Sequence, residues 1–284
     1  MKKNKKDPTE EVLKSLNKEE KELLRHFFDE LILRASAAYV LWGTKPIADY
    51  TACFLTPEEI RDANNEFEKL PQETKDELNK RQVSFPIITE KHWKVWEKVK
   101  DQLPMHNFII TTKVWNEPHA PDIVVISITN LIVVLDGNYD LFKQKIGHDF
   151  NPTQVAFEYT DGEGNFTEFW EKVYEDEVLK GLIFGYGKKN ALFYKHWWED
   201  FYCNQKIKNY PKQLAYWQNV KFICTHLKET VFKKKLSYEE IELPFFSHLP
   251  HDPVVEQYKH QRKEIIKAYK GKDSLQITLQ KLCE

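Results

Sequence analysis

The segment that decides the fold is DIVVISI, which runs from Asp122 to Ile128. Its apolar residues stand at consecutive positions, so both faces of an extended chain would be buried there, as in the central strand of a sheet. A second strand is predicted just before it, over residues 107–114, where β-branched and aromatic residues are frequent. A sheet is therefore expected in the middle of the chain.

Towards the N-terminus the sequence predicts one long helix followed by a strand. Asp7 and Pro8 have the layout of a helix start, and leucine and phenylalanine then keep a helical period up to about Arg34. The next residues, 38–42, are predicted to form a strand that ends in a turn at Gly43–Pro46.

Towards the C-terminus the pattern is mainly helical. Residues 131–146 are predicted as one helix that ends at Gly147. Asp252 and Pro253 begin a last helix, and residues 275–279 are expected to close the chain as an extended segment.

These elements predict an α+β fold, predominantly helical with a small and mostly antiparallel sheet. One α+β domain over residues 1–284 is the simplest account, because no linker or internal repeat divides the chain. Residues 1–35 could instead form an N-terminal helical arm that swaps onto a partner chain.

Composition excludes several classes of function. The chain has 42 basic and 44 acidic residues, for a formal net charge of −2, and so weak a field disfavours nucleic acid as a partner. With only 9 glycines in 284 residues, a glycine-rich nucleotide loop is not expected. No cofactor is predicted.

The cysteines and the apolar segments bear on localisation. No cysteine lies in a CxxC pair, so free buried thiols in a reducing compartment are expected for the four cysteines, Cys53, Cys203, Cys224 and Cys283. The basic start is followed by acidic residues where a signal peptide needs an apolar run. The longest apolar stretch, residues 123–135, is too short to span a bilayer. We therefore expect a cytoplasmic protein, or an exported one if a signal has been removed.

One candidate anion site is GYGKKN, at Gly185–Asn190. Glycines permit a close approach of the backbone, and a helix expected to begin at Lys188 would present free amides to an anion. The candidate ligand residues in this corner are Tyr186, Lys188, Lys189 and Asn190. The alternative is a corner between two helices, with solvated lysines and glycines that serve only the turn.

A second candidate lies in the Gly43–Pro46 turn. Lys45 stands there beside Trp42, and an exposed lysine and aromatic ring at the end of a sheet could contact a phosphate or a carboxylate. The alternative is that Lys45 only decorates the turn and Trp42 faces the core.

Other motifs do not meet the spacing that their chemistry needs. Pro250 prevents a regular helix from placing His248 and His251 on one face, and Asp252 is better explained as a helix cap, so no metal site is predicted. Residues 161–165 begin like a calcium loop but lack its later ligands. The aromatic block at residues 194–202 is expected to be core rather than a single-strand nucleic-acid surface.

Three blocks resemble an uncharacterised protein family of chlamydia-like and other intracellular bacteria. They are AYVLWGTKP at residues 38–46, GLIFGYGKKNA at residues 181–191, and residues 263–279. The resemblance implies a host-associated bacterial origin, but it carries no known activity and no site residues. Some members of that group have an export or lipoprotein signal, from which this N-terminus departs.

Two functions are compatible with these patterns. The first is a soluble, non-enzymatic binding or interaction protein of a host-associated bacterium with a protein partner, because no catalytic motif occurs at its required spacing. The second is an enzyme or sensor for an anionic small molecule, bound between the Gly43–Pro46 turn and the Gly185–Asn190 corner.

Overall fold

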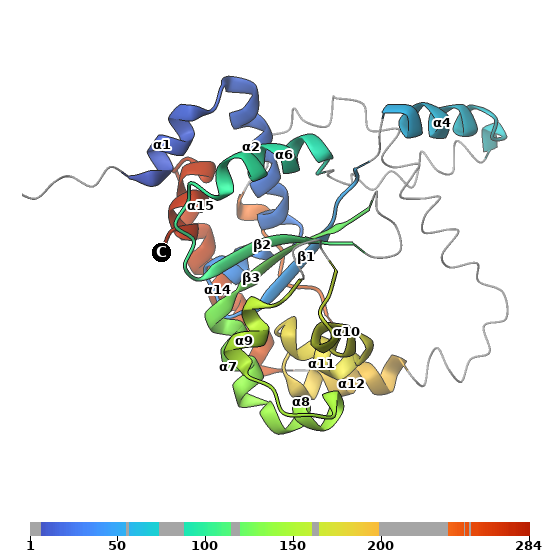
Figure 1. Cartoon of the computed structure of the whole chain (residues 1–284), viewed down its shortest axis with the longest axis vertical. Coiled ribbons are helices and arrows are strands. Elements are labelled where there is room, and N and C mark those ends of the chain that lie inside the picture. Colours follow the sequence, from blue (N-terminus) through green and yellow to red (C-terminus); the bar gives the residue numbers. More distant parts are fainter. Residues whose placement is uncertain are drawn as a thin grey trace, which may run out of the picture.

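The computed structural model describes residues 7–54, 57–73, 88–114, 120–160, 165–198, 238–246, 248–249 and 251–284 (Figure 1). Its sheet has three antiparallel strands in the order β1-β3-β2, with bounds β1 (Ile47–Thr51), β2 (Phe108–Lys113) and β3 (Asp122–Ser127). The central position predicted for residues 122–128 is confirmed, and five of the six residues of β3 are buried. A predominantly helical α+β fold is likewise confirmed.

Each face of the sheet covers a separate hydrophobic core. Side chains alternate along β3, so that Ile123 and Val125 join the first core while Val124 and Ile126 join the second. Figure 1 shows one group of helices on each side of the sheet. The first core is built from α1 (Pro8–Ser15), α2 (Lys18–Leu33), α3 (Ala37–Leu41), α6 (Glu90–Lys100), α14 (Pro253–Tyr269) and α15 (Ser274–Leu282).

The second core is formed mainly by one continuous part of the chain. Its helices are α7 (Ile128–Gly137), α8 (Tyr139–Ile146), α9 (Pro152–Phe157), α10 (Glu168–Glu175) and α11 (Glu177–Ile183). The remaining described helices are α4 (Pro57–Glu68), α12 (Lys188–Trp198) and the short 3₁₀ helix η3 (Tyr238–Glu240).

The predicted helices are divided by polar caps. The prediction of one N-terminal helix is wrong, because Asn17 accepts a hydrogen bond from the backbone of Glu20 while the Glu20 side chain accepts one from Asn17, which begins α2 anew. The single helix predicted over residues 131–146 is likewise two helices, since Asn138 closes α7 by donating to the carbonyl of Val134.

Two predicted strands are helices. Residues 38–42 lie mostly in α3, whose five residues are all buried, and a short apolar run of this kind has no periodicity that separates strand from helix. Residues 275–279 lie in α15, which begins after Asp273 accepts a hydrogen bond from the backbone of Gln276.

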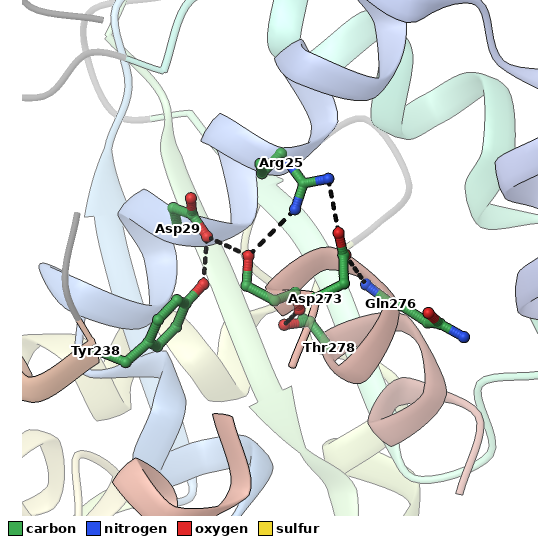
Figure 2. A network of polar contacts seen from close by, with 7 residues as sticks. Arg25, Asp29, Tyr238, Asp273, Gln276 and Thr278 are labelled. Carbon is green, nitrogen blue, oxygen red and sulfur yellow. Dashed lines mark hydrogen bonds and ion pairs between the residues drawn. The ribbon is translucent and has the colours of Figure 1, made fainter. Parts of the chain in front are cut away.

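A polar network joins the two ends of the chain. Asp29 of α2 accepts hydrogen bonds from the hydroxyls of Tyr238 and Ser274, and Arg25 pairs with Asp273 at 3.0 Å (Figure 2). Burial raises the pKa of the Asp29 carboxyl, and its two hydrogen bonds oppose that rise. From residue 7 onward the N-terminal helices therefore pack within this chain, against α6 and α15.

Some predicted features lie outside the described residues. These are residues 1–6 of the basic start, residues 161–164 of the calcium-like loop, residues 199–202 of the aromatic block, and two of the cysteines, Cys203 and Cys224. Cys53 forms a disulfide bond, so the expectation of free thiols is wrong for this residue, whereas Cys283 is free. In the described part of the chain, no helix has the length and apolar character needed to cross a membrane.

A chain of titratable side chains crosses the first core. Nδ1 of His26 lies 3.0 Å from Nε2 of His92, and Nε2 of His26 lies 3.7 Å from Glu30. Burial lowers the pKa of His26 to about 4 and that of His92 to about 3, and it raises the pKa of Glu30 to about 7. Glu30 is 3% exposed, and no described donor reaches its Oε2 atom.

This burial predicts a pH-dependent effect of Glu30→Gln. Because the pKa of Glu30 is raised in the folded state, folding favours the protonated acid, and stability is lost as pH rises from about 4.5 through about 7. We expect the variant to be more stable than the wild type by roughly 2 kcal/mol at pH 8 and nearly equal to it at pH 4.5. Urea unfolding at both pH values measures the difference, with Glu22→Gln on the exposed face of α2 as control. A difference that does not change with pH would contradict the prediction.

Candidate functional site

The candidate site is centred on Lys45, which lies in the turn between α3 and β1. Its side chain is buried, with 3% exposure, and its Nζ donates a hydrogen bond of 2.6 Å to the carbonyl of Phe184. The ammonium lies 5.2 Å from the centroid of the Phe184 ring and 5.0 Å from that of Tyr186. It is therefore enclosed by two aromatic rings that can stabilise a cation.

The turn that carries Lys45 is held from two sides. Asn130 donates hydrogen bonds to the carbonyls of Gly43 and Lys45, at 3.0 and 3.4 Å. Thr44 accepts hydrogen bonds from Gln257 and Gln261 of α14, each at 3.0 Å. The backbone around Lys45 is thus fixed by groups from α7 and α14.

The two glycine-containing blocks pack directly against one another. Gly185 has a φ of +76°, and its carbonyl accepts a hydrogen bond of 2.9 Å from the hydroxyl of Tyr258. A Cβ at this position would lie 2.5 Å from that hydroxyl, 3.1 Å from Pro46 and 3.5 Å from Cα of Lys45. Only a glycine lets the corner approach the turn so closely.

Asp49 lies on the same side of the chain as Lys45. Ile47 and Asp49 alternate along β1, and Ile47 belongs to the second core, so the acid stands over the face that covers this core. The Lys45 ammonium reaches the same side, because it contacts Phe184 of the second core. Asp49 itself is exposed. Among the described residues, no carboxylate lies within 4 Å of the Lys45 ammonium, and no side chain donates a hydrogen bond to Asp49.

The two groups shift each other's proton affinity. Burial lowers the pKa of Lys45 below its ordinary value, and the negative charge of Asp49 partly opposes this shift. The protein crowded around Asp49 raises the pKa of its carboxyl, and the charge of Asp122 raises it further. The centre therefore combines an amine that is easier to deprotonate with an acid that is easier to protonate.

A second pair of opposite charges, Asp122 and Lys113, lies on the same face of the sheet, beside the strand position two residues after Asp49. The strand register places Asp122 between Thr51 and Lys113. The Thr51 hydroxyl donates a hydrogen bond of 2.6 Å to Asp122, and the buried Lys113 ammonium lies 3.5 Å from the centroid of the Phe166 ring. The polar end of the face thus carries charges of both signs.

Aromatic side chains cover this end of the face. Ring contacts run from Tyr159 through Phe166 and Tyr174 to Phe184 and Tyr186. The hydroxyls of Tyr159 and Tyr174 share a hydrogen bond, and burial raises the pKa of both phenols. The cover is therefore apolar apart from a few hydroxyls.

Of the residues singled out in the sequence, the structure brings Lys45 and Tyr186 together. Asn190 braces the same corner, because its amide donates to the carbonyl of Tyr186 at 2.8 Å and accepts from the backbone of Leu249 at 3.1 Å. Trp42 packs in the first core, where its indole donates to the hydroxyl of Tyr269 at 3.3 Å.

The two lysines of the corner have a different environment. Lys188 and Lys189 are exposed at the start of α12, whereas Lys45 is enclosed. Sequence reasoning missed Asp49 and Asp122, which belong to no motif. The signal that could have found Asp49 is its spacing of two residues from Ile47, because residues 47–54 were expected to return from the turn as an extended segment.

The histidine cluster near residue 250 does not resemble a metal centre. His248 contacts the carbonyl of the following residue, and Asp252 accepts a hydrogen bond from Val254, as predicted for a helix cap. Within the ranges that the structure describes, no three or more histidine, cysteine, aspartate and glutamate residues are grouped so as to hold a metal ion.

A groove of about 770 Å³ runs along α14, away from the Lys45 centre. Charged side chains of both signs and two apolar residues line it, namely Ile241, Glu242, Leu243, Glu256, Lys259, His260, Arg262 and Lys263. Phe245, which follows this lining in sequence, is 98% exposed.

Comparison with protein-family models, with curated proteins and with solved structures gives no match to this chain. The resemblance to the chlamydia-like family therefore stays a prediction. The function is inferred from the geometry of the chain's own residues.

Proposed function

We propose that this chain binds a small anionic molecule beside Lys45, as a sensor or an enzyme, where the Gly43–Pro46 turn meets the Gly185–Asn190 corner. The observation that carries the proposal is the buried Lys45 ammonium, which has no carboxylate within 4 Å among the described residues. An ammonium has three hydrogen-bond donors, and Lys45 uses one of them on the carbonyl of Phe184.

A lysine in this position opposes the stability of the fold. Removing an ammonium from water costs several kcal/mol unless a counter-charge compensates for it, and a carbonyl with two rings compensates only in part. Costly, perturbed charges of this kind cluster at functional sites. A bound anion would supply both the missing counter-charge and acceptors for the unused donors.

The other residues of the corner support binding in distinct ways. Tyr186 and Phe184 flank the ammonium, and Asn190 fixes the turn that carries Tyr186. Lys188 and Lys189 are exposed nearby in sequence and add positive potential that attracts an anion to this region.

Isothermal titration calorimetry with inorganic phosphate and with succinate tests the proposal. We expect at least one of them to bind the wild type and to lose roughly 10- to 100-fold in affinity in Lys45→Gln, because a hydrogen-bonded charge contributes about 1.5–3 kcal/mol. Lys94→Gln, which removes an exposed lysine of α6 on the side of the first core, should change the affinity less than threefold. The proposal fails if neither anion binds, or if Lys45→Gln binds as well as the wild type.

The expectation of a non-enzymatic interaction protein stays a prediction. The groove along α14 favours it, because apolar and charged side chains lie together there beside an exposed phenylalanine. The bacterial origin and the cytoplasmic location also stay predictions. The Lys45 centre is the better-supported site, because a bound anion would offset the cost of burying an ammonium that has one hydrogen bond.

A further inference from the structure

We propose that the molecule bound beside Lys45 is a small zwitterion, whose anionic group contacts Lys45 and whose amino group contacts Asp49. This inference rests on the proposed function, and it adds the chemical class of the ligand. It concerns the face of the sheet that covers the second core, at its polar end.

The first argument is that the two opposite charges share one face without pairing. Lys45 lies in the turn two residues before β1 begins, and Asp49 is the third residue of β1, so the two charged groups leave the chain four residues apart. No ion pair within 4 Å joins these two described residues, although each affects the pKa of the other. Charges that served only to stabilise the fold would gain most by direct contact. Two charges held apart match a molecule that carries the opposite charge at each end.

The second argument is that each charge has unused hydrogen-bonding capacity. Lys45 is enclosed and has donors left over, whereas Asp49 is exposed and accepts from no described side chain. The inner end of the site is therefore basic and the outer end acidic. A ligand would enter with its anionic group first and leave its amino group at the carboxylate.

The third argument is the second carboxylate at the outer end. Asp122 is the diagonal neighbour of Asp49 across the two strands, roughly 7 Å away. Its own charge raises the pKa of Asp49, which shows that the two acids repel one another. The amino group of a ligand placed near Asp49 and Asp122 would relieve that repulsion. The aromatic rings that cover this end of the face would stabilise the ammonium further.

Matched pairs of ligands test the inference. Calorimetry would compare acetate with glycine, propionate with β-alanine, and butyrate with 4-aminobutyrate, since each pair differs only by the amino group. We expect at least one amino acid to bind ten times more tightly than its partner acid. In Asp49→Asn that ratio should fall below threefold, while the affinity for the plain acid stays equal or rises. Asp136→Asn, which changes an exposed acid of α7, should leave the ratio unchanged.

The outcomes separate the two proposals. If plain acids bind in a Lys45-dependent manner and no amino acid binds more tightly, the zwitterion proposal is wrong and the anion-site proposal is supported. The zwitterion proposal is also wrong if the wild type and Asp49→Asn prefer an amino acid over its partner acid to the same degree. If no compound binds in a Lys45-dependent manner, both proposals are wrong.

Discussion

Lys45→Met is expected to unfold at a higher urea concentration than the wild type at pH 6, although it should no longer bind the ligand. Methionine has a similar length and no charge, and it would pack between Ile47 and the rings of Phe184 and Tyr186. The loss of one hydrogen bond to the carbonyl of Phe184 lowers the free energy of unfolding by about 1 kcal/mol. The removal of a buried, uncompensated charge raises it by more than that. We expect a net gain of roughly 2 kcal/mol.

The pH dependence of this gain gives a second measurement. The folded pKa of Lys45 is lowered, so the wild type loses stability as pH falls from the ordinary lysine pKa through the folded one. Methionine removes that dependence. The advantage of Lys45→Met should therefore be largest at pH 6 and shrink towards pH 9.5 in urea unfolding experiments.

Lys180→Met is the matched control, because Lys180 of α11 forms an ion pair with Glu177 and is partly exposed. This variant should change the stability by less than about 0.5 kcal/mol. A loss of stability in Lys45→Met at pH 6 would assign Lys45 a structural role, and the case for a ligand site would then lose its main support.

Gly185→Ala is expected to have the largest destabilising effect, roughly 3–4 kcal/mol. The positive φ of +76° strains any residue with a Cβ, at about 1–2 kcal/mol, and the collision at 2.5 Å with the Tyr258 hydroxyl adds a packing penalty. Gly271→Ala is the control, since this residue has a φ of +72° but nothing within 4 Å of the Cβ position. It should lose only the 1–2 kcal/mol of backbone strain.

The double variant Gly185→Ala with Tyr258→Phe separates the two causes. Removing the hydroxyl relieves the collision, so the combined loss should be smaller than the sum of the single losses by at least about 1 kcal/mol. Thermal or urea unfolding of the four proteins measures this coupling. Additive losses would show that the corner can move away from Tyr258 at no cost.

The sequence predicted the fold class because its strongest signals are local. The apolar run at residues 122–128 is buried on both faces wherever it lies in a sheet, and Asp252 caps a helix through its own side chain. Asn17 was missed because its capping box lies inside an unbroken helical period. Residues 38–42 were misassigned because a short apolar run suits a strand and a buried helix equally. Residues 275–279 were misassigned because apolar and polar side chains alternate there, which is typical of a strand.

The candidate site was harder to predict from the sequence, because its residues come from distant segments. Lys45 and Tyr186 stood out through the glycines beside them, which indicate close backbone approach. Asp49 and Asp122 meet only through the antiparallel register of β1 and β3, and no single segment encodes that register. Burial of Lys45 was unpredictable in the same way, since it depends on the Phe184 carbonyl 139 residues along the chain.

The division into two cores has a consequence for synthesis on the ribosome. Most of the second core lies between residues 124 and 184, so it can close soon after this stretch has emerged. The first core needs both α2 and α15, and it must wait for about 100 further residues, or roughly 5–20 s at ordinary rates of translation. During that interval α2 can pack against α6, but the part of its surface that packs against α15 has no permanent partner. We expect the nascent chain to depend on a chaperone at this stage, and to release it only when its last helix is complete.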